Sequence, residues 1–574
     1  MKSFLPFLKP YRRQFVLGPL TKLAEAILEL LMPLMMARLM DFGILQRDSA
    51  YIIRISLWMA GIACAGFLCS LFCQHSASVA SQGFGTALRD ALYSHISALP
   101  RRDREQFGAA TLLNRQTTDV TQLQVAVAML IRFGTRAPFL LIGGIAMAMT
   151  VDFQLSLILL ICLPLFGAVL FVLTSKTIPL YQKTQKLLDR LSIVLRENLF
   201  GVRVVRAFGQ TKSESARFDD ANQHQANLAL HAGKLSAWLS PMTLLLMNAA
   251  TLCVVWFGGF RVDSGELTQG QLIAFISYVT QIMLALIVAS NHTVLFTRAA
   301  AAGKRVAEVL NTTPSITSGH ATNLQPGAPI VAFDNVSFQF ENGAAHALDG
   351  ISFRAEAGQT IGIVGGTGAG KSTLASLLLR FDDATDGEIR IGGVPIQNWD
   401  LGALRQKIGF VPQTALLFTG TVESNIRHGK PNASDNEIHR AADLAQATEF
   451  IAHMPDGLAS PIDQDGRNLS GGQKQRLTIA RAIVRRPDIL ILDDSASALD
   501  YATDARLRSA LKTLDTKVTF IISQRISAIM DADMILVLDN GILTGQGDHG
   551  SLFRQNPVYR EICLSQGIVG EVDA

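Results

Sequence analysis

A glycine-rich segment in the second half of the chain has the residues needed to bind phosphate groups. An apolar stretch, 361–364, runs into Gly365-x-x-x-x-Gly370-Lys371-Ser372, and a helix-forming stretch follows. Strand, loop and helix in this order make a P-loop, in which backbone N–H groups cradle phosphates, the lysine reaches the β- and γ-phosphates and the serine hydroxyl binds Mg²⁺. The predicted phosphate site comprises Gly365, Gly366, Thr367, Gly368, Ala369, Gly370, Lys371, Ser372 and Thr373.

Two neighbouring carboxylates have the chemistry to hold a metal ion and activate water beside those phosphates. The apolar run 489–492 predicts a buried strand, and it ends in Asp493 and Asp494. We expect Asp493 to hold Mg²⁺, directly or through water. Asp494 follows at the position from which a general base would polarise the attacking water. The two motifs together predict a Mg²⁺-dependent site for a nucleoside triphosphate.

A third motif, Leu469-Ser470-Gly471-Gly472-Gln473, places glycines before a helix and so predicts an anion site at a helix N-terminus. The order of the P-loop, LSGGQ and ILILDD resembles that of ABC transporter ATPases. Together with the apolar first half, the whole chain resembles a half-transporter of the ABC exporter type.

The resemblance implies that ATP is the nucleotide and that two ATPase domains pair head to tail. Each ATP would then lie between one P-loop and the LSGGQ of the partner. Carried over by position, Phe340 is expected to stack on adenine and Gln413 to contact Mg²⁺. The segment from Ser497 to Asp500 matches the loop that communicates with the opposite site.

Two positions depart from the family pattern. The residue after the Mg²⁺-binding aspartate is usually Glu and is here Asp494, and the switch position, usually His, is Gln524. Aspartate is one methylene shorter than glutamate, and glutamine can neither carry the charge of histidine nor relay its proton. Beside an intact LSGGQ, this pattern resembles the degenerate-site subunit of heterodimeric bacterial exporters. A homodimer is the alternative.

The elements before the ATPase motifs are predicted to lie in a membrane. The chain is 49% hydrophobic and 17% charged, below the roughly 25% charge of soluble domains. Six stretches approach the length of about 20 apolar residues that a span requires. They are 15–40, 55–78, 128–150, 153–175, 238–260 and 271–296. Lys and Arg concentrate in the connections after the second and fourth spans, which places these connections, both termini and the ATPase domain in the cytoplasm.

The predicted fold class is a six-helix transmembrane domain fused to an α/β P-loop ATPase domain. We expect the transmembrane domain at 1–310, a linker at 311–329 and the ATPase domain at 330–574. The two basic connections read as helical extensions of the spans, with tips near 107–113 and 198–208, which match the family's coupling helices. They would carry force between the ATPase and the membrane, or be ordinary cytoplasmic insertions.

The first span carries Lys22, Glu25 and Glu29 on one helix face. Ionisable groups inside a span usually face a bundle interior or a watery cavity. Glu25 and Glu29 are therefore candidates for a substrate path that favours cations. The alternative is that they form structural ion pairs or lie at the membrane interface.

The sequence predicts ATP-driven export of lipophilic, drug-like compounds across the cytoplasmic membrane. The expected partners are a second ABC half-transporter, the lipid bilayer and a hydrophobic small molecule. The net charge of +4 does not suggest nucleic-acid binding. A siderophore importer of the same fold and an ATP-gated channel or regulator are the alternatives, whereas the six spans exclude a soluble ABC ATPase.

Overall fold

The computed structural model describes residues 2–340, 345–495 and 498–568. The chain divides into two compact units. The first unit comprises Met1–Ser97 and Gly108–Thr312, and the second comprises Ala98–Phe107 and Thr313–Ala574. The ten-residue segment between the two parts of the first unit therefore folds with the second.

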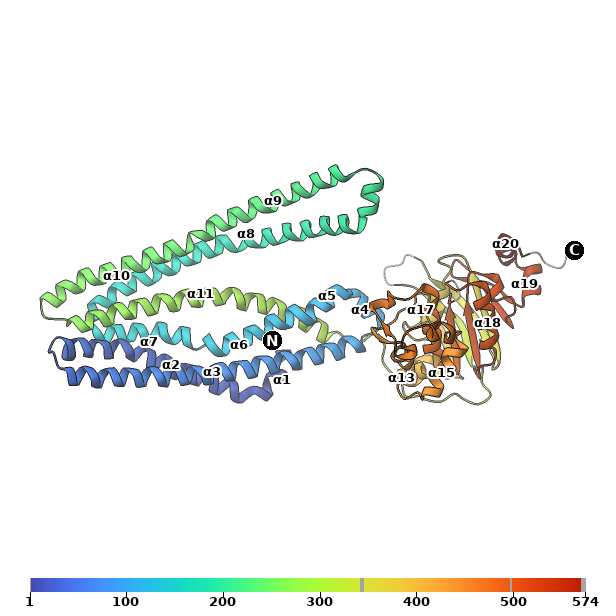
Figure 1. Cartoon of the computed structure of the whole chain (residues 1–574), viewed down its shortest axis with the longest axis horizontal. Helices are drawn as coiled ribbons and strands as arrows, with labels where there is room; N and C mark the ends of the chain where they lie inside the picture. Colours follow the sequence, from blue (N-terminus) through green and yellow to red (C-terminus); the bar gives the residue numbers. More distant parts are fainter. Residues whose placement is uncertain (1, 341–344, 496–497, 569–574) are drawn as a thin grey trace. The chain divides into compact units, whose positions relative to one another are not determined.

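The first unit is helical throughout (Figure 1). Its α-helices are α1 (Leu5–Leu8), α2 (Arg12–Arg38), α3 (Ser49–Ala98), α5 (Ala109–Asn114), α6 (Val120–Phe133), α7 (Arg136–Val151), α8 (Phe153–Ala207), α9 (Thr211–Ala237), α10 (Leu239–Asp263) and α11 (Gln269–Asn311). A π-helical segment, Leu39–Ile44, follows α2, and another, Arg115–Asp119, joins α5 to α6.

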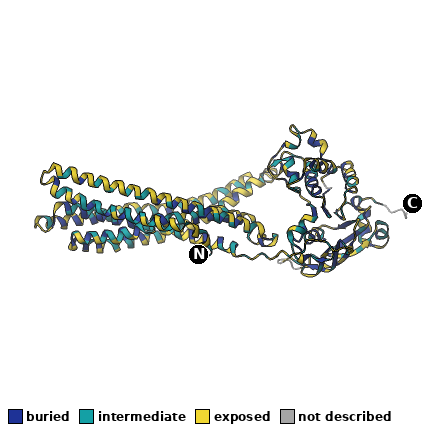
Figure 2. Cartoon of the chain, turned by 90° about the horizontal axis from the view of Figure 1, so that it is seen from below, coloured by how far each residue is buried: buried dark blue, intermediate teal, exposed yellow. Residues whose placement is uncertain are grey.

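Within the described residues, five helical stretches are long and apolar enough to cross a membrane. They are Ser49–Ala98, Ala109–Val151, Phe153–Ala207, Thr211–Asp263 and Gln269–Asn311. Each contains one of the predicted spans after the first. Buried, intermediate and exposed residues alternate along these helices (Figure 2), as expected for helices that face both a bundle and lipid.

The first predicted span corresponds to α2, which carries too many charged side chains to be recognised by hydropathy alone. It nevertheless packs in the same bundle, against α7 and α11. Tyr278 of α11 is fully buried, and its hydroxyl donates a hydrogen bond of 2.8 Å to the carbonyl of Leu30. The predicted fold class, a helical membrane domain fused to an α/β domain, is confirmed.

Helices α8 and α9 form a long antiparallel hairpin (Figure 1). The Asp152 carboxylate caps α8 by accepting a hydrogen bond of 2.8 Å from the Leu155 amide, which satisfies a donor that the helix leaves open. At 55 residues, α8 is about 80 Å long and exceeds the thickness of a bilayer core of about 30 Å. The hairpin turns at 208–210, at the end of the predicted tip.

The first helical extension reverses before its predicted tip at 107–113. Helix α3 ends at Ala98 because Pro100 follows, and proline disfavours helical backbone in the residue before it. Helix α4 (Arg101–Phe107) makes the reversal, and Gly108, with φ +75°, precedes α5. The predicted tip therefore covers the last residue of α4, Gly108 and most of α5.

The second unit is an α/β domain whose described residues form three sheets. Its strands are β1 (Val331–Phe338), β2 (Leu348–Ala355), β3 (Gln359–Gly365), β4 (Asp386–Ile391), β5 (Val394–Pro395), β6 (Ile408–Val411), β7 (Gly420–Thr421), β8 (Pro461–Ile462), β9 (Ile489–Asp493), β10 (Val518–Ile522), β11 (Met534–Asp539) and β12 (Ile542–Gly547). Besides α4, its helices are α12 (Lys371–Leu378), α13 (Leu401–Lys407), α14 (Val422–Arg427), α15 (Asp435–Leu444), α16 (Thr448–Ala452), α17 (Gly471–Ile483), α18 (Tyr501–Leu511), α19 (His549–Gln555) and α20 (Pro557–Ser565).

The largest sheet has six strands in the order β12-β11-β3-β10-β9-β6. Its inner strands are parallel and almost entirely buried, as expected for a sheet covered on both faces. A second, antiparallel sheet has the order β2-β1-β4-β5, and a short pair joins β7 to β8. Within the six-stranded sheet, Ile522 of β10 is in register with both Ile363 of β3 and Asp493 of β9.

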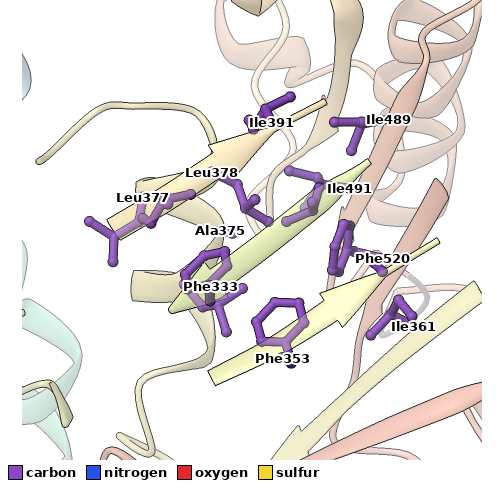
Figure 3. Packing of buried hydrophobic residues seen from close by; sticks show 14 of the residues in the cluster. Phe333, Phe353, Ile361, Ala375, Leu377, Leu378, Ile391, Ile489, Ile491 and Phe520 are labelled. Carbon is purple, nitrogen blue, oxygen red and sulfur yellow. The ribbon is translucent and has the colours of Figure 1, made fainter. Parts of the chain in front are cut away.

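The core of this unit lies between the two larger sheets and α12 (Figure 3). Phe333 of β1 stacks on Phe353 of β2 with 4.7 Å between ring centroids. Phe353 in turn meets Phe520 of β10 edge-on at 6.3 Å. These aromatic contacts join the antiparallel sheet to the sheet that carries the P-loop.

The segment after α11 is held along the second unit by backbone hydrogen bonds. The amide of Gly319 donates to the carbonyl of Trp399, and the next two amides donate to that of Asn398, each at 2.9 Å. Asp103 of α4, which is buried, accepts a hydrogen bond of 2.8 Å from the Ser315 amide. This hydrogen bond joins helix α4 directly to the segment after α11.

Trp399 connects this segment to the core, since its ring is fully buried and its Nε1 donates to the Ile391 carbonyl at 3.2 Å. We expect Trp399→Ala to lower the unfolding free energy of the second unit by about 3–5 kcal/mol. Thermal unfolding of the full-length protein measures the effect. The control is Gln397→Ala, an exposed position in the same loop, and an equal loss in the control would contradict this role of Trp399.

Candidate nucleotide-binding site

A cavity of about 330 Å³ opens at the edge of the sheet where β3, β9 and β10 end. Among the residues that line it are these predicted site residues: Phe340, Thr367, Gly368, Ala369, Gly370, Lys371, Ser372, Thr373, Gln413, Asp493, Asp494 and Gln524. The parallel strands thus bring together residues that lie more than 150 positions apart in the sequence.

At two glycines of the P-loop, a side chain would collide with neighbouring backbone. Gly370 has φ +94°, and a Cβ there would lie 2.5 Å from the carbonyl oxygen of Ala347. A Cβ on Gly365 would lie 2.1 Å from the carbonyl oxygen of Leu538. A side chain at either position would displace the backbone, so the glycines allow the loop to curl tightly before α12.

The Lys371 ammonium group is held inside the loop. Its Nζ donates to the carbonyls of Gly365 at 2.9 Å and Gly366 at 2.6 Å. Burial lowers the pKa of Lys371, against the opposing effect of the nearby Asp493 and Asp494 carboxylates. The lysine and the N-terminus of α12 therefore face the cavity together, an arrangement that favours bound phosphate.

Asp493 and Ser372 fit a Mg²⁺ ion that is shared with phosphate. The Asp493 carboxylate is buried and hydrogen-bonds with the Ser372 hydroxyl. Burial raises the pKa of Asp493, the Asp494 carboxylate adds to this effect, and the Ser372 hydrogen bond and Lys371 oppose it. A cation beside this carboxylate would favour its charged form. Carboxylate and hydroxyl oxygens, completed by phosphate oxygens, are the ligands that Mg²⁺ accepts.

The Asp494 backbone turns sharply out of β9. Its φ is +45°, a conformation that aspartate tolerates better than most residues, and its amide donates to the Ile522 carbonyl at 2.8 Å. The Gln413 side-chain amide lies 3.4 Å from the Asp494 carboxylate. Gln524, two residues beyond Ile522, completes this side of the cavity. Both departures from the family pattern therefore lie in one cavity.

Phe340 is 53% exposed at the mouth of the cavity. Its ring packs edge-on against Phe338 with 4.9 Å between centroids, which leaves ring surface available to stack on a base. Three further residues line the cavity that the sequence did not single out: Ala347, Ile522 and Ser523. Ile522 ends β10 and Ser523 follows it, so their position directly before the switch residue Gln524 is the signal in the sequence that could have indicated them.

The LSGGQ motif lies outside the described lining of this cavity. Ser470 caps α17 by accepting a hydrogen bond of 3.3 Å from the Gln473 amide, and the Gln473 side chain accepts one of 2.9 Å from the Ser470 amide. This capping box explains the spacing of the motif. Ser470 and Gly471 are exposed, and Leu469, Gly472 and Gln473 are partly buried.

The loop expected to communicate with the opposite site is partly described. Asp500 caps α18 by accepting a hydrogen bond of 2.9 Å from the Thr503 amide. Ser497 lies outside the described residues. Among the described residues, neither Asp500 nor the LSGGQ motif lines the cavity.

The two acidic candidates of the first span both have basic partners. Glu25 lies 2.7 Å from the Nζ of Lys22, and Glu29 lies 2.8 Å from the guanidinium of Arg136 on α7. The Arg136 pair joins α2 to α7. These contacts match the structural ion pairs that were the alternative to a path for cations.

Comparison with known proteins identifies both units. Residues 15–286 match the ABC transporter transmembrane region, and residues 348–497 match the ABC transporter family. An uncharacterized ABC transporter ATP-binding protein of Mycobacterium tuberculosis is 37% identical over 98% of each chain. An ATP-dependent lipid A-core flippase of Chromobacterium violaceum is 31% identical over 98% of this chain and 96% of its own.

A solved structure matches over nearly the whole length. It is that of a bacterial Atm1-family ABC exporter with ATP bound, and it covers 97% of this chain and 99% of its own with a TM-score of 0.80 and 27% identity. The likeness extends over both units of the chain.

Lys371→Ala tests whether this cavity is the nucleotide site. We expect the variant to lose ATP binding by about 100-fold or more, because hydrogen bonds from a charged lysine contribute roughly 1.5–3 kcal/mol each. Binding of a fluorescent ATP analogue to the full-length protein in lipid nanodiscs measures the loss. Lys512→Ala, an exposed lysine outside this cavity, is the control, and unchanged affinity in Lys371→Ala would remove the P-loop assignment.

Proposed function

This chain belongs to the ABC transporter family and is an ATP-driven transporter of the exporter type, and from that premise we propose that it is one half of a heterodimeric exporter of lipophilic compounds. Its own ATP site would bind Mg²⁺-ATP and hydrolyse it slowly. Its LSGGQ motif would complete the competent site of the partner.

The observation that carries the proposal is the separation of the two halves of an ATP site within one chain. The cavity holds Lys371, Ser372 and Asp493, whereas the capping box of Ser470 and Gln473 lies outside its described lining. The N-terminus of α17 is open to an anion supplied by a second ATPase domain. A second half-transporter, facing this one head to tail, would close both sites.

The slow turnover of this chain's own site follows from Asp494 and Gln524. The Asp494 side chain is shorter than that of glutamate, and the Gln413 amide lies 3.4 Å from its carboxylate. Gln524 cannot accept and release a proton near neutral pH, as histidine does. Asymmetry of this kind favours two different chains over two copies of this one.

Lipophilic cargo is favoured by the apolar bundle and by the pairing of its acids. Glu25 and Glu29 are both neutralised by basic neighbours, which weakens the preference for cations that these carboxylates suggested. If Glu25 and Glu29 lined a substrate path, a cationic substrate would have to break these ion pairs to reach them. The name of the relative from Chromobacterium violaceum, a lipid A-core flippase, supports cargo with a large apolar part.

The proposed setting is the cytoplasmic membrane, with both termini and the ATPase domain in the cytoplasm. The membrane domain would extend over 1–310 and the ATPase domain over 330–574. The segment 311–329 would connect the two. The α8–α9 hairpin would transmit closure of the ATPase domains to the spans.

ATP hydrolysis by the purified chain alone, compared with the chain co-purified with the half-transporter encoded beside it, tests the heterodimer. We expect near-zero hydrolysis by the chain alone and at least about tenfold more by the pair, because a positioned base and its partner contribute factors of roughly 10²–10⁴. A catalytic-base variant of the partner should abolish the gain. Full activity of the chain alone would favour a homodimer.

Restoring the family residues tests the weak site directly. We expect the double variant Asp494→Glu with Gln524→His to raise hydrolysis about tenfold or more when the partner's own site is inactivated. The control is Asp515→Glu, the same change at an exposed aspartate outside the cavity. An unchanged rate in the double variant would contradict the assignment of these residues as the cause of slow turnover.

A further inference from the structure

The loop that carries Gln524 is held from the C-terminal end of the second unit. Gln566, which follows α20, donates from its side-chain amide to the carbonyl of Gln524 at 2.7 Å. The side-chain oxygen of the same residue accepts a hydrogen bond of 2.9 Å from the Ile526 amide. One glutamine side chain thus spans the loop on both sides of Arg525.

Helix α20 is itself firmly attached, so that Gln566 has a fixed base. Tyr559 and Cys563 on its inner face are fully buried, and the Tyr559 hydroxyl lies 2.8 Å from Nδ1 of His549. Asn556 caps the helix by accepting a hydrogen bond of 2.9 Å from the Tyr559 amide. A side chain that leaves such an anchor can restrain the loop that it contacts.

Arg525 links the loop both to Ser523, which lines the cavity, and to Tyr501 at the start of α18. The Arg525 amide donates to the Ser523 hydroxyl at 3.0 Å, and the Arg525 guanidinium lies over the Tyr501 ring at 5.3 Å. Tyr501 begins α18, directly after Asp500. The loop therefore connects the C-terminal helix with the start of α18.

The backbone of Gln524 is held by Gln566, whereas Gln524 itself lines the cavity. Gln524 lies two residues after Ile522, which is in register with Asp493, so it lies on the side of the cavity that holds the carboxylates. In a P-loop site this is where the lysine meets the β- and γ-phosphates. A terminal phosphate bound by Lys371 would therefore lie on the side of the cavity that Gln524 lines.

We propose that Gln566 is a positioning residue that holds the 523–526 loop so that Gln524 faces the terminal phosphate of ATP. It acts through the loop and does not touch the nucleotide. The proposal rests on the assignment of the cavity as the ATP site. It predicts that the C-terminal helix influences discrimination between ATP and ADP.

Nucleotide affinity separates positioning from general stability. In Gln566→Ala, we expect the Kd for Mg²⁺-ATP to rise about threefold to tenfold and the Kd for ADP to stay unchanged, since ADP lacks the phosphate that the loop faces. The full-length chain in lipid nanodiscs and fluorescent ATP and ADP analogues are used. Equal losses of both affinities, or no loss of either, would overturn the proposal.

Hydrogen exchange tests the loop contact without relying on nucleotide binding. Gln566→Ala should speed exchange of the 523–527 peptide about threefold to tenfold, with β10 and the melting temperature unchanged. Gln566→Glu retains the acceptor for the Ile526 amide but replaces the donor to Gln524 with an oxygen that its carbonyl repels, and we expect exchange of the loop to speed up in this variant as well. Gln555→Ala, an exposed glutamine of α19, is the matched control.

The two measurements distinguish failure of this inference from failure of the proposed function. Unchanged exchange of the loop in Gln566→Ala would overturn the positioning role even if ATP binds normally. Faster exchange of the loop in Gln555→Ala as well would also overturn it. A wild-type protein that binds no ATP would overturn the nucleotide site and, with it, this proposal.

Discussion

The register of three parallel strands is the constraint on which the nucleotide site depends. Ile363, Ile522 and Asp493 lie side by side on β3, β10 and β9, so the loops that follow these strands emerge at one edge of the sheet. Ligand sites of open α/β sheets form at the carboxyl ends of the strands for this reason. A slip of one residue in either pairing would turn Asp493 away from the P-loop, because side chains alternate between faces.

Charged side chains have different partners in the two units, because one is an apolar helical bundle and the other carries an open cavity for a charged ligand. In the helical bundle, carboxylates on α2 are paired with Lys22 and Arg136, since an unpaired charge in an apolar bundle is costly. In the nucleotide cavity, the partly buried Lys371 donates to the Gly365 and Gly366 carbonyls, and the buried Asp493 hydrogen-bonds with the Ser372 hydroxyl. Phosphate and a metal ion can satisfy them, and their desolvation makes those contacts stronger than they would be in water.

The sequence was most informative where chemistry requires a motif or where a bilayer requires a length. The P-loop glycines, the Asp493–Asp494 pair and five of the six spans are recognisable because sterics, metal chemistry and hydrocarbon thickness restrict the residues that fit. The first span was harder, since its ion pairs depend on partners such as Arg136, more than 100 positions away. The helical pattern predicts the tip of the first extension at 107–113, whereas Pro100 ends α3 earlier and α4 makes the reversal.

Contacts that one side chain makes with a distant segment cannot be predicted from a pattern in the sequence. Gln566 is an ordinary glutamine in the sequence, and only the folded chain places it against the 524–526 backbone. The same holds for Asp103, whose partner is the Ser315 amide. Such contacts have no periodicity and no preferred spacing, so composition and motifs cannot indicate them.

The contact between Asp103 and Ser315 also has a consequence for biosynthesis. Residues 98–107 belong to the second unit, yet they emerge from the ribosome before the segment Gly108–Thr312 that separates them from the rest of that unit. At translation rates of about 5–20 residues per second, α4 waits roughly 10–40 s for its partners. During that interval the membrane helices are being inserted, so assembly of the second unit cannot be completed until the bundle has been synthesised. Because of this order of translation, the contact between α4 and the segment around Ser315 forms late in folding.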